Sequence, residues 1–354
     1  MNLLDTITSL SHEFGAPEYV KAGGGNTSCK TADTLWIKPS GTTLAALTPE
    51  KFVAMDRATL AKLYAAEAPA EPAAREELVK DMMAAAVKPE TPGRASVEAP
   101  LHDSLAARFV VHTHPAAVNG LTCAVGGRAA MARLFPDALW VPYTDPGYTL
   151  CMAVRKAILA YRAEHGREPV LIFLENHGVF VSGDTEEDIR AAYGRVMGAL
   201  SAAYAEAGIT QDVAVGASPS ESDVAAWRNV LAEGLGADGA AVAVSGRFCA
   251  SRGPISPDHI VYSKSYPFEG VLTAENLRAF QDVRGYAPRV IVLDGAVLGV
   301  GATEKVASLA LELALDGARV QRLTRTFGGI QYLDDRSRGF IENWEVESYR
   351  SKQV

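Results

Sequence analysis

The sequence predicts an α/β protein with two domains, and three observations support that prediction. The chain has 354 residues, enough for two domains of about 100–200 residues each. With 48% hydrophobic and 21% charged residues, its composition is that of an ordinary globular protein. Strand-like and helix-like patterns alternate along residues 1–208, and a polar, turn-rich stretch follows at 209–222. We therefore expect one domain at 1–212 and a second α/β domain at 213–354.

Apolar periodicity, caps and turn residues predict the elements in chain order. In the first domain, helices are expected at about 2–14, 49–56, 73–87, 99–108 and 149–165, after Pro115, and from Thr185 to about 207. Strands are expected at about 109–114 and in the segments LWIK, LWV, PVLIFLE and GVFVSG. In the second domain, helices are expected at 223–234, 273–284 and 303–317, and strands near 240–249, 258–262 and in RVIVLDGAVLGVG.

Charge and targeting signals limit the partners and the compartment. The 34 basic and 42 acidic residues give a net charge of −8, which argues against nucleic acid or an anionic membrane as the main partner. No stretch approaches the roughly 18–20 apolar residues of a membrane span, and MNLLDTITSL lacks the features of a secretory signal. The four cysteines are scattered without a C-x-x-C pair, as in reduced proteins. A cytoplasmic protein is expected.

Three histidines stand where they can converge. The segment RFVVHTHP places His112 and His114 at the end of an apolar strand, where a period of two puts both rings on one face. His177 lies in a tight turn after PVLIFLE, which can aim a third imidazole at the same strand ends. Considered alone, His112 and His114 are explained as well by two surface histidines at a strand end as by metal ligands. His177 alone is explained better as an ordinary turn residue. Together, three imidazole nitrogens and one open position are the composition of a catalytic Zn²⁺ site.

Glu98 is the carboxylate that can join these histidines. A helix of two to three turns after Glu98 moves the chain away by about 12–15 Å, and the strand that follows brings it back about as far. Glu98 can therefore finish beside the histidines, as a fourth ligand or as the base next to a metal. The alternative is a surface glutamate at a helix start. His102, one helical turn later, is interpreted as a supporting or structural residue rather than a ligand.

Two turns of small residues can approach an anion. GGGN at 23–26 and PSG at 39–41 free backbone N–H groups, and side-chain donors such as Ser96 stand nearby. Lys38 can add positive charge, since the histidine set disfavours a Schiff-base lysine. A Walker A loop is excluded because no G-K-[ST] follows. Ordinary loops are the alternative explanation, so a phosphate site is expected only in combination with the metal site.

Two segments of the chain are alike. HGVFVSGDTEED and DGAVLGVGATEK both run from a turn through an apolar strand and a glycine to Thr-Glu and a helix. Either the likeness is chance, or the second domain is a degenerate relative of the first, with Asp294 in place of His177. The G-x-G of the second segment is not expected to bind a dinucleotide, because Glu304 replaces the third glycine or alanine.

The ordered motifs GGGNTS, IKPSG, SVEAPLH, VVHTHP and LENHGVFVSG resemble the class II (zinc-dependent) aldolase/adducin family over about residues 5–205. That family includes fuculose- and rhamnulose-1-phosphate aldolases and ribulose-5-phosphate 4-epimerase. The C-terminal part, with FGGIQYLDDRSRGFIENWEVESYR, resembles the extension in the aldolase half of bifunctional rhamnulose-1-phosphate aldolase/alcohol dehydrogenases, and no dehydrogenase function is carried over. The resemblance implies a three-layer fold with a central, mainly antiparallel sheet flanked by helices, plus a smaller α/β domain.

The resemblance also implies roles for single residues. The ligands of Zn²⁺, with Mn²⁺ or Co²⁺ as substitutes, would be His112, His114 and His177. Glu98 matches the catalytic acid/base. The positions that hold the substrate phosphate would be Gly25, Asn26, Ser40, Gly41 and Ser96, with Val97 where some members have a second serine. No motif matches the family's catalytic tyrosine, for which Tyr143 and Tyr148 are the candidates.

The reaction implied is the retro-aldol cleavage of a ketose 1-phosphate, or a similar sugar phosphate, to dihydroxyacetone phosphate and an aldehyde through a metal-stabilised enediolate. A homo-oligomer is implied, with a tetramer favoured, because sites in the family lie between subunits. An epimerase, a sugar-phosphate dehydratase or a decarboxylase would share the same histidines and stays open as an alternative. An adducin-like scaffold without activity is disfavoured, because the three histidines and Glu98 are all present. The sequence does not identify the sugar.

Overall fold

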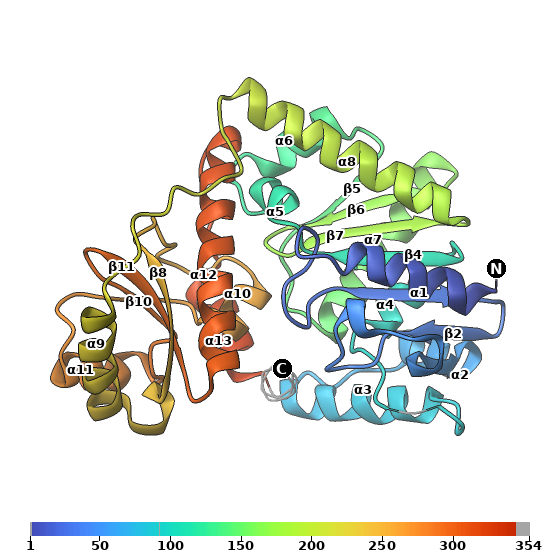
Figure 1. Cartoon of the computed structure of the whole chain (residues 1–354). Helices are drawn as coiled ribbons and strands as arrows, with labels where there is room; N and C mark the ends of the chain where they lie inside the picture. The colour runs from blue at the N-terminus through green and yellow to red at the C-terminus, as the bar shows by residue number, and fades with distance from the viewer. Residues whose placement is uncertain (1, 92, 345–354) are drawn as a thin grey trace. The chain divides into compact units, whose positions relative to one another are not determined.

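The structure is a computed structural model that describes residues 2–91 and 93–344 (Figure 1). The described residues form two compact units, the first from residues 2–118 and 128–200 and the second from residues 119–127 and 201–344. Both units combine helices with a sheet, so the predicted α/β class is confirmed. The division into domains at 1–212 and 213–354 stays a prediction, because a compact unit need not fold alone. The end of the predicted C-terminal motif, residues 345–350, lies outside the described residues.

A seven-stranded sheet forms the centre of the first unit. Its order is β3-β2-β1-β4-β7-β6-β5, and every neighbouring pair is antiparallel except β5 with β6. The strands are β1 (Asn26–Lys30), β2 (Thr34–Ile37), β3 (Val53–Asp56), β4 (Phe109–Thr113), β5 (Leu139–Val141), β6 (Leu171–Leu174) and β7 (Gly178–Gly183). The predicted central, mainly antiparallel sheet is confirmed.

Helices cover both faces of this sheet and complete three layers (Figure 1). On one face lie α1 (Leu3–Phe14) and α8 (Glu186–Glu206), where Phe14 stacks on Tyr193. On the other face lie α4 (Ala99–Ser104) and α7 (Tyr148–His165), whose apolar side chains pack with Val110 and Phe180 of the sheet. The other helices of this half of the chain are α2 (Arg57–Ala61), α3 (Pro72–Ala86), α5 (Ala116–Thr122) and α6 (Gly127–Leu134).

The second unit contains a four-stranded sheet. Its order is β8-β11-β10-β9, with only β9 and β10 parallel. The elements are β8 (Ala241–Gly246), β9 (Phe268–Glu269), β10 (Val290–Val292), β11 (Ala296–Gly301), α9 (Glu221–Leu235), α10 (Pro257–Ser263), α11 (Ala274–Arg284), α12 (Glu304–Thr324) and α13 (Asp335–Asn343). Apolar residues of α9 and α11 cover one face of the sheet, around Ile291, and residues of α12 cover the other face, around Val297. Within the described residues, no helix is long and apolar enough to cross a membrane.

Two local predictions were wrong. The expected helix at 49–56 is a 3-10 turn (Pro49–Lys51) followed by β3, in which Val53 and Met55 are buried while the strand pairs with β2. The expected strand at 258–262 is α10, because Pro257 stands in its first turn, where the fixed φ of proline suits a helix. In addition, the polar strand β1 was not predicted, although all five of its residues are buried. For β1 and β3, burial by the neighbouring elements overrides the weak local signal.

The two similar segments fold alike. Each forms the second strand of a hairpin, β6–β7 or β10–β11, and each leads into a helix of 21 residues, α8 or α12. In the second segment, a side chain at Gly299 would collide with the backbone of α12 at Ala307. Glycine at this position therefore allows the strand and the helix to pack closely.

Candidate metal centre and catalytic site

Three histidines meet at the ends of neighbouring strands. His112 belongs to β4, His114 follows that strand directly, and His177 lies in the turn between β6 and β7. Their ligand atoms lie within 4.8 Å of one another, and all three residues are buried. The Nε2 atoms of His112 and His114 are 2.9 Å apart. The structure thus brings together the three residues that the sequence singled out as metal ligands.

The turn that carries His177 has special backbone geometry. Asn176 has a left-handed conformation, with a φ of 53°. Gly178 lies so close to β4 that a side chain there would collide with the carbonyl oxygen of Thr113 and with the ring of His114. Only glycine tolerates this approach, so the Asn-His-Gly sequence is what brings His177 against His114.

The ring of His112 is held in one orientation. Its Nδ1 lies 3.0 Å from the carbonyl oxygen of Val179, and its face stacks on Phe180 with 3.8 Å between the centroids. A carbonyl oxygen only accepts hydrogen bonds, so Nδ1 carries the proton and Nε2 presents its lone pair to the cluster. Three imidazole nitrogens, one of them oriented in this way, fit a catalytic transition-metal ion, and this donor set can hold one.

Glu98 lies at the start of α4, beside the histidines. Its Oε1 is 3.6 Å from His112 Nε2 and 3.9 Å from His177 Nε2, and the side chain is 11% exposed. Its Oε2 accepts a hydrogen bond from Nδ2 of Asn26. Asn26 is the register partner of His112 across β1 and β4, so the sheet places the amide beside the cluster. The Oδ1 of Asn26 is buried and accepts no hydrogen bond within the described residues.

The residues expected to hold phosphate lie on three segments joined by hydrogen bonds. The backbone N–H of Ser40 donates to the carbonyl of Arg94 (2.8 Å), and that of Ser96 donates to the carbonyl of Lys38 (3.2 Å). The ammonium group of Lys38 donates to the carbonyl of Gly23 (3.1 Å). The hydroxyl of Ser96 accepts from the backbone N–H of Glu98 at 3.3 Å. The loops at 23–26, 38–41 and 94–98 therefore adjoin the Glu98 side of the cluster.

Gly25 and Gly41 both have left-handed backbone conformations, with φ values of 71° and 80°. A side chain at Gly25 would lie 2.8 Å from the carbonyl oxygen of His112. Gly25 therefore has a packing role, since it lets the loop close on β4. Because the N–H of Ser40 is already bonded to Arg94, an anion would meet Ser40 through its hydroxyl group.

The two candidate tyrosines lie in different surroundings. The backbone N–H of Tyr143 donates to the carboxylate of Glu175 (3.1 Å), two residues before His177, and its hydroxyl donates to Asp145 at 3.5 Å. Tyr148 begins α7 and packs against the apolar cluster that includes Leu60. Burial is the main cause that raises the pKa of Tyr148. A proton-donor role for either residue stays a prediction.

A polar network under Glu98 was missed by the sequence analysis. The hydroxyl of Ser28 lies 2.8 Å from Nδ1 of His102, and Lys30 donates from Nζ to the carbonyl oxygens of His102 and, at 2.5 Å, Leu105. Burial holds the pKa of His102 well below its ordinary value, so the ring is neutral. Burial also lowers the pKa of Lys30 to about 7, although Asp103 opposes that shift. The sequence offered no local signal for this network, because NTSCK is a polar segment without the alternating apolar residues of a typical strand.

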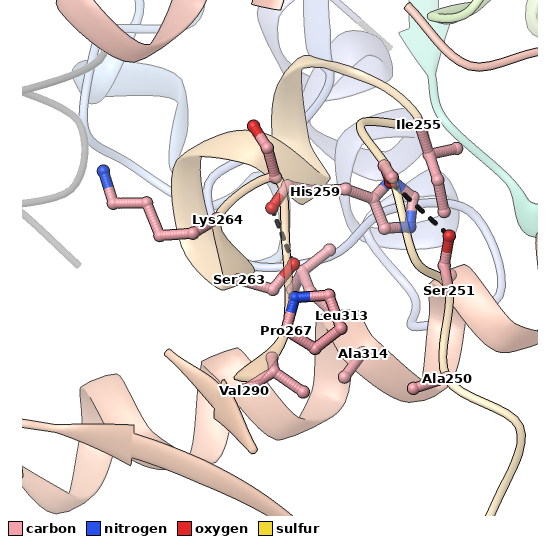
Figure 2. Close-up of a pocket in the computed structure, with 13 residues that line it drawn as sticks. Ala250, Ser251, Ile255, His259, Ser263, Lys264, Pro267, Val290, Leu313 and Ala314 are labelled. Atoms are coloured by element: carbon pink, nitrogen blue, oxygen red, sulfur yellow. Dashed lines mark hydrogen bonds between the residues drawn. The ribbon is translucent and has the colours of Figure 1, made fainter. Parts of the chain in front are cut away.

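The second unit has a small pocket of its own, with an empty volume of about 330 Å³ that includes its open mouth. Figure 2 shows His259 and Ser263 of α10 near Leu313 and Ala314 of α12, while Lys264 extends away from them. Nδ1 of His259 lies 2.7 Å from the hydroxyl of Ser256, and its Nε2 lies 3.4 Å from Asp316. Ser256 is 2% exposed and so has no access to a substrate. This network joins α10 to α12.

Comparisons with known proteins address the first unit. Residues 5–204, more than half of the chain, match the family described as the class II aldolase and adducin N-terminal domain. A 175-residue stretch is 29% identical to a Bacillus subtilis protein named uncharacterized oxidoreductase YuxG, over 47% of this chain and 24% of that protein. The chain thus spans about a quarter of that relative's length.

Two solved structures are similar to the same part of the chain. The N-terminal class II aldolase domain of a conserved protein from Thermoplasma acidophilum is 24% identical, over 56% of this chain and 92% of that one, with a TM-score of 0.48. L-fuculose-1-phosphate aldolase from Thermus thermophilus is 21% identical, over 58% of this chain and 94% of that one, with a TM-score of 0.38. The assignment rests on the sequence match over residues 5–204. By that match, the chain belongs to the class II aldolase and adducin family.

Proposed function

We propose that this protein is a metal-dependent aldolase that cleaves a ketose 1-phosphate to dihydroxyacetone phosphate and an aldehyde. The observation that carries the proposal is the position of the Glu98 carboxylate, 3.6 Å from His112 Nε2 and 3.9 Å from His177 Nε2. A proton acceptor beside a cluster of three imidazoles is what the reaction needs in one place. Membership of the class II aldolase and adducin family supports the same proposed activity.

The metal would be held by the three imidazoles of His112, His114 and His177. The donor set favours Zn²⁺, with Mn²⁺ or Co²⁺ as substitutes. Bound there, the cation would act as a Lewis acid that polarises the carbonyl and an adjacent hydroxyl of the ketose.

Glu98 would move the proton. Because Asn26 holds Oε2, the other carboxylate oxygen keeps its orientation toward the histidines. Glu98 would return a proton to C3 after the C3–C4 bond breaks, and it would remove that proton in the condensation direction.

The phosphate of the substrate would lie against the adjoining loops at 23–26, 38–41 and 94–98. Its contacts would come from Gly25, Asn26, Ser40, Gly41 and Ser96, with Lys38 adding positive charge. The second acid would be Tyr143 or Tyr148, and the assembly would be a homo-oligomer, with a tetramer favoured.

The proposal is tested by incubating the Zn²⁺-loaded protein with a panel of ketose 1-phosphates and detecting dihydroxyacetone phosphate. We expect this product and an aldehyde in equal amounts from at least one ketose, and none with His114→Ala. If a substrate is converted but no dihydroxyacetone phosphate is formed, the site would be assigned to epimerisation, dehydration or decarboxylation instead. A metal-loaded protein that converts no sugar phosphate or keto acid would favour a scaffold without activity.

A further inference from the structure

We propose that a row of side chains on β1, acting with His102 of α4, positions Glu98 for proton transfer. The row consists of Asn26, Ser28 and Lys30. The inference rests on the proposed function, in which Glu98 exchanges the proton. Ser28, Lys30 and His102 would act through Glu98 and are therefore positioning residues.

The first support is the alternation of β1. Successive residues of a strand point to opposite faces, so Asn26, Ser28 and Lys30 share one face. Each of them contacts α4 or its flanking residues: Asn26 bonds Glu98, Ser28 bonds His102, and Lys30 bonds the carbonyls of His102 and Leu105. Thr27, between them, points to the other face, where its hydroxyl lies 2.7 Å from that of Ser11 in α1.

The second support is that the row holds both ends of α4. From Asn26 to Lys30 a strand advances by about 13 Å, and from Glu98 to Leu105 a helical path advances by about 10 Å, so the two spans are of similar length. Glu98 is the residue that precedes the helix, and Lys30 bonds carbonyl groups at its C-terminal end, where a cation is favoured. A helix of six residues is too short to be stable alone, so its position depends on such contacts.

The third support is that His102 contacts both Glu98 and, through Phe180, the predicted metal ligand His112. Its backbone N–H donates to the carbonyl of Glu98 at 3.0 Å, so a shift of His102 moves Glu98 directly. Its ring meets Phe180 edge-on at 5.2 Å, and Phe180 in turn stacks on His112. Nε2 of His102 has no hydrogen-bond partner within the described residues, so the bond to Ser28 orients the ring.

The test compares Ser28→Ala with two matched controls. Thr27→Val removes a buried hydroxyl bond from the same strand but on the opposite face. Tyr64→Phe removes the bonds of a hydroxyl group to Asp103 (2.9 Å) and to the carbonyl of Pro100 (3.0 Å) in the same helix, neither of which involves a residue of β1. We expect Ser28→Ala to lower kcat roughly 10- to 100-fold with KM nearly unchanged, since small misplacements of a catalytic group have effects of this size. Both controls should keep kcat within about twofold, even where they lower the melting temperature equally.

A second readout does not depend on turnover. In the Co²⁺-loaded protein, Glu98→Gln should change the visible absorption bands, because the carboxylate lies beside the three histidines. Ser28→Ala should change the bands in the same direction, while Thr27→Val should leave them as in the wild type. The spectra report on the placement of Glu98 even if no ketose 1-phosphate is cleaved, so failure of the proposed function and failure of this inference are distinguishable.

The geometry of the His102 bond allows one more comparison. The amide of asparagine reaches the place of Nδ1, whereas the amide of glutamine reaches farther, toward Nε2. Because Ser28 contacts Nδ1, His102→Asn should retain more kcat and a more native Co²⁺ spectrum than His102→Gln. Equal losses in Ser28→Ala and Thr27→Val, or a native spectrum in Ser28→Ala, would overturn the inference and leave the row a purely structural contact.

Discussion

The imidazole ring of His112 lies flat against the ring of Phe180, with 3.8 Å between the centroids and 10° between the planes. The two residues are register partners on β4 and β7, so the sheet itself sets their separation. With Nδ1 bonded to the carbonyl of Val179, the stack leaves Nε2 directed at the cluster. A side chain without any ligand atom thereby orients a predicted metal ligand.

Replacing Phe180 with leucine should therefore weaken metal binding. Loss of groups that orient a ligand costs about 10- to 100-fold in metal affinity, which competition with a chromophoric chelator measures. Phe173→Leu is the matched control, since Phe173 is also fully buried in the sheet but its ring contacts Phe135, tilted by 30° with 5.1 Å between the centroids. Both variants should lose stability, and only Phe180→Leu should lose affinity. Equal affinities in the two variants would show that the stack does not orient His112.

The purified protein should carry about one Zn²⁺ per chain, which elemental analysis measures. The basis is the buried cluster of three imidazoles, and His114→Ala removes one of them. Because a ligand of the native state stabilises it, a chelator should lower the melting temperature of the wild type but not that of His114→Ala. Active protein without any divalent metal would contradict the prediction.

Glu98→Gln should keep the metal and lose turnover. The carboxamide has nearly the shape of the carboxylate but cannot shuttle a proton, so a loss of roughly 10²- to 10⁴-fold in kcat is expected. Metal content and kcat are measured on the same preparation. Near-normal turnover would transfer the proton-exchange role to another group, with Tyr143 as the first to examine.

Lys30 should make stability depend on pH. Burial lowers its pKa to about 7 in the folded chain, against roughly 10.4 when unfolded. Between these values the unfolded chain binds more protons, so the free energy of unfolding rises with pH, by at most about 1.4 kcal/mol per unit from this residue. Lys30→Met does not titrate, so urea unfolding from pH 7 to 9 should show the wild type gaining stability relative to the variant. A constant difference would show that the ammonium group keeps its ordinary pKa.

The most successful site predictions rest on spacing within one element or across two consecutive elements. The spacing of His112 and His114 at a strand end, and the lengths of the helix and strand after Glu98, predicted a convergence that the structure has at 3.6 Å. The row on β1 could not be predicted from the sequence, because Ser28 and His102 are 74 residues apart. Their contact depends on strand pairing, which a polar segment such as NTSCK does not signal.

The C-terminal part of the chain supports a segment that lies inside the family match. Within the second unit, the backbone N–H groups of Val125 and Gly126 donate to Gly329 (3.0 Å) and Phe327 (2.8 Å), and that of Gln331 donates to Cys123 (2.7 Å). Removing residues after 212 would leave these backbone groups without their partners, at a cost of about 1–3 kcal/mol for each buried one. It would also uncover the side of Gly120 that contacts Leu323.

Truncation after residue 212 should therefore reduce solubility or substrate affinity while leaving the three histidines able to bind metal. A substitution in the full chain tests the same contact without removing any residue. Gly120→Ala would press a methyl group against Tyr204 and Leu323, whereas Gly194→Ala and Gly198→Ala in α8 meet no atom within 4 Å. Thermal unfolding should show a loss for Gly120→Ala, while the two controls should be neutral or slightly stabilised, because alanine favours a helix over glycine. A truncated protein that is soluble, oligomeric and kinetically unchanged would show instead that the C-terminal part is an independent appendage.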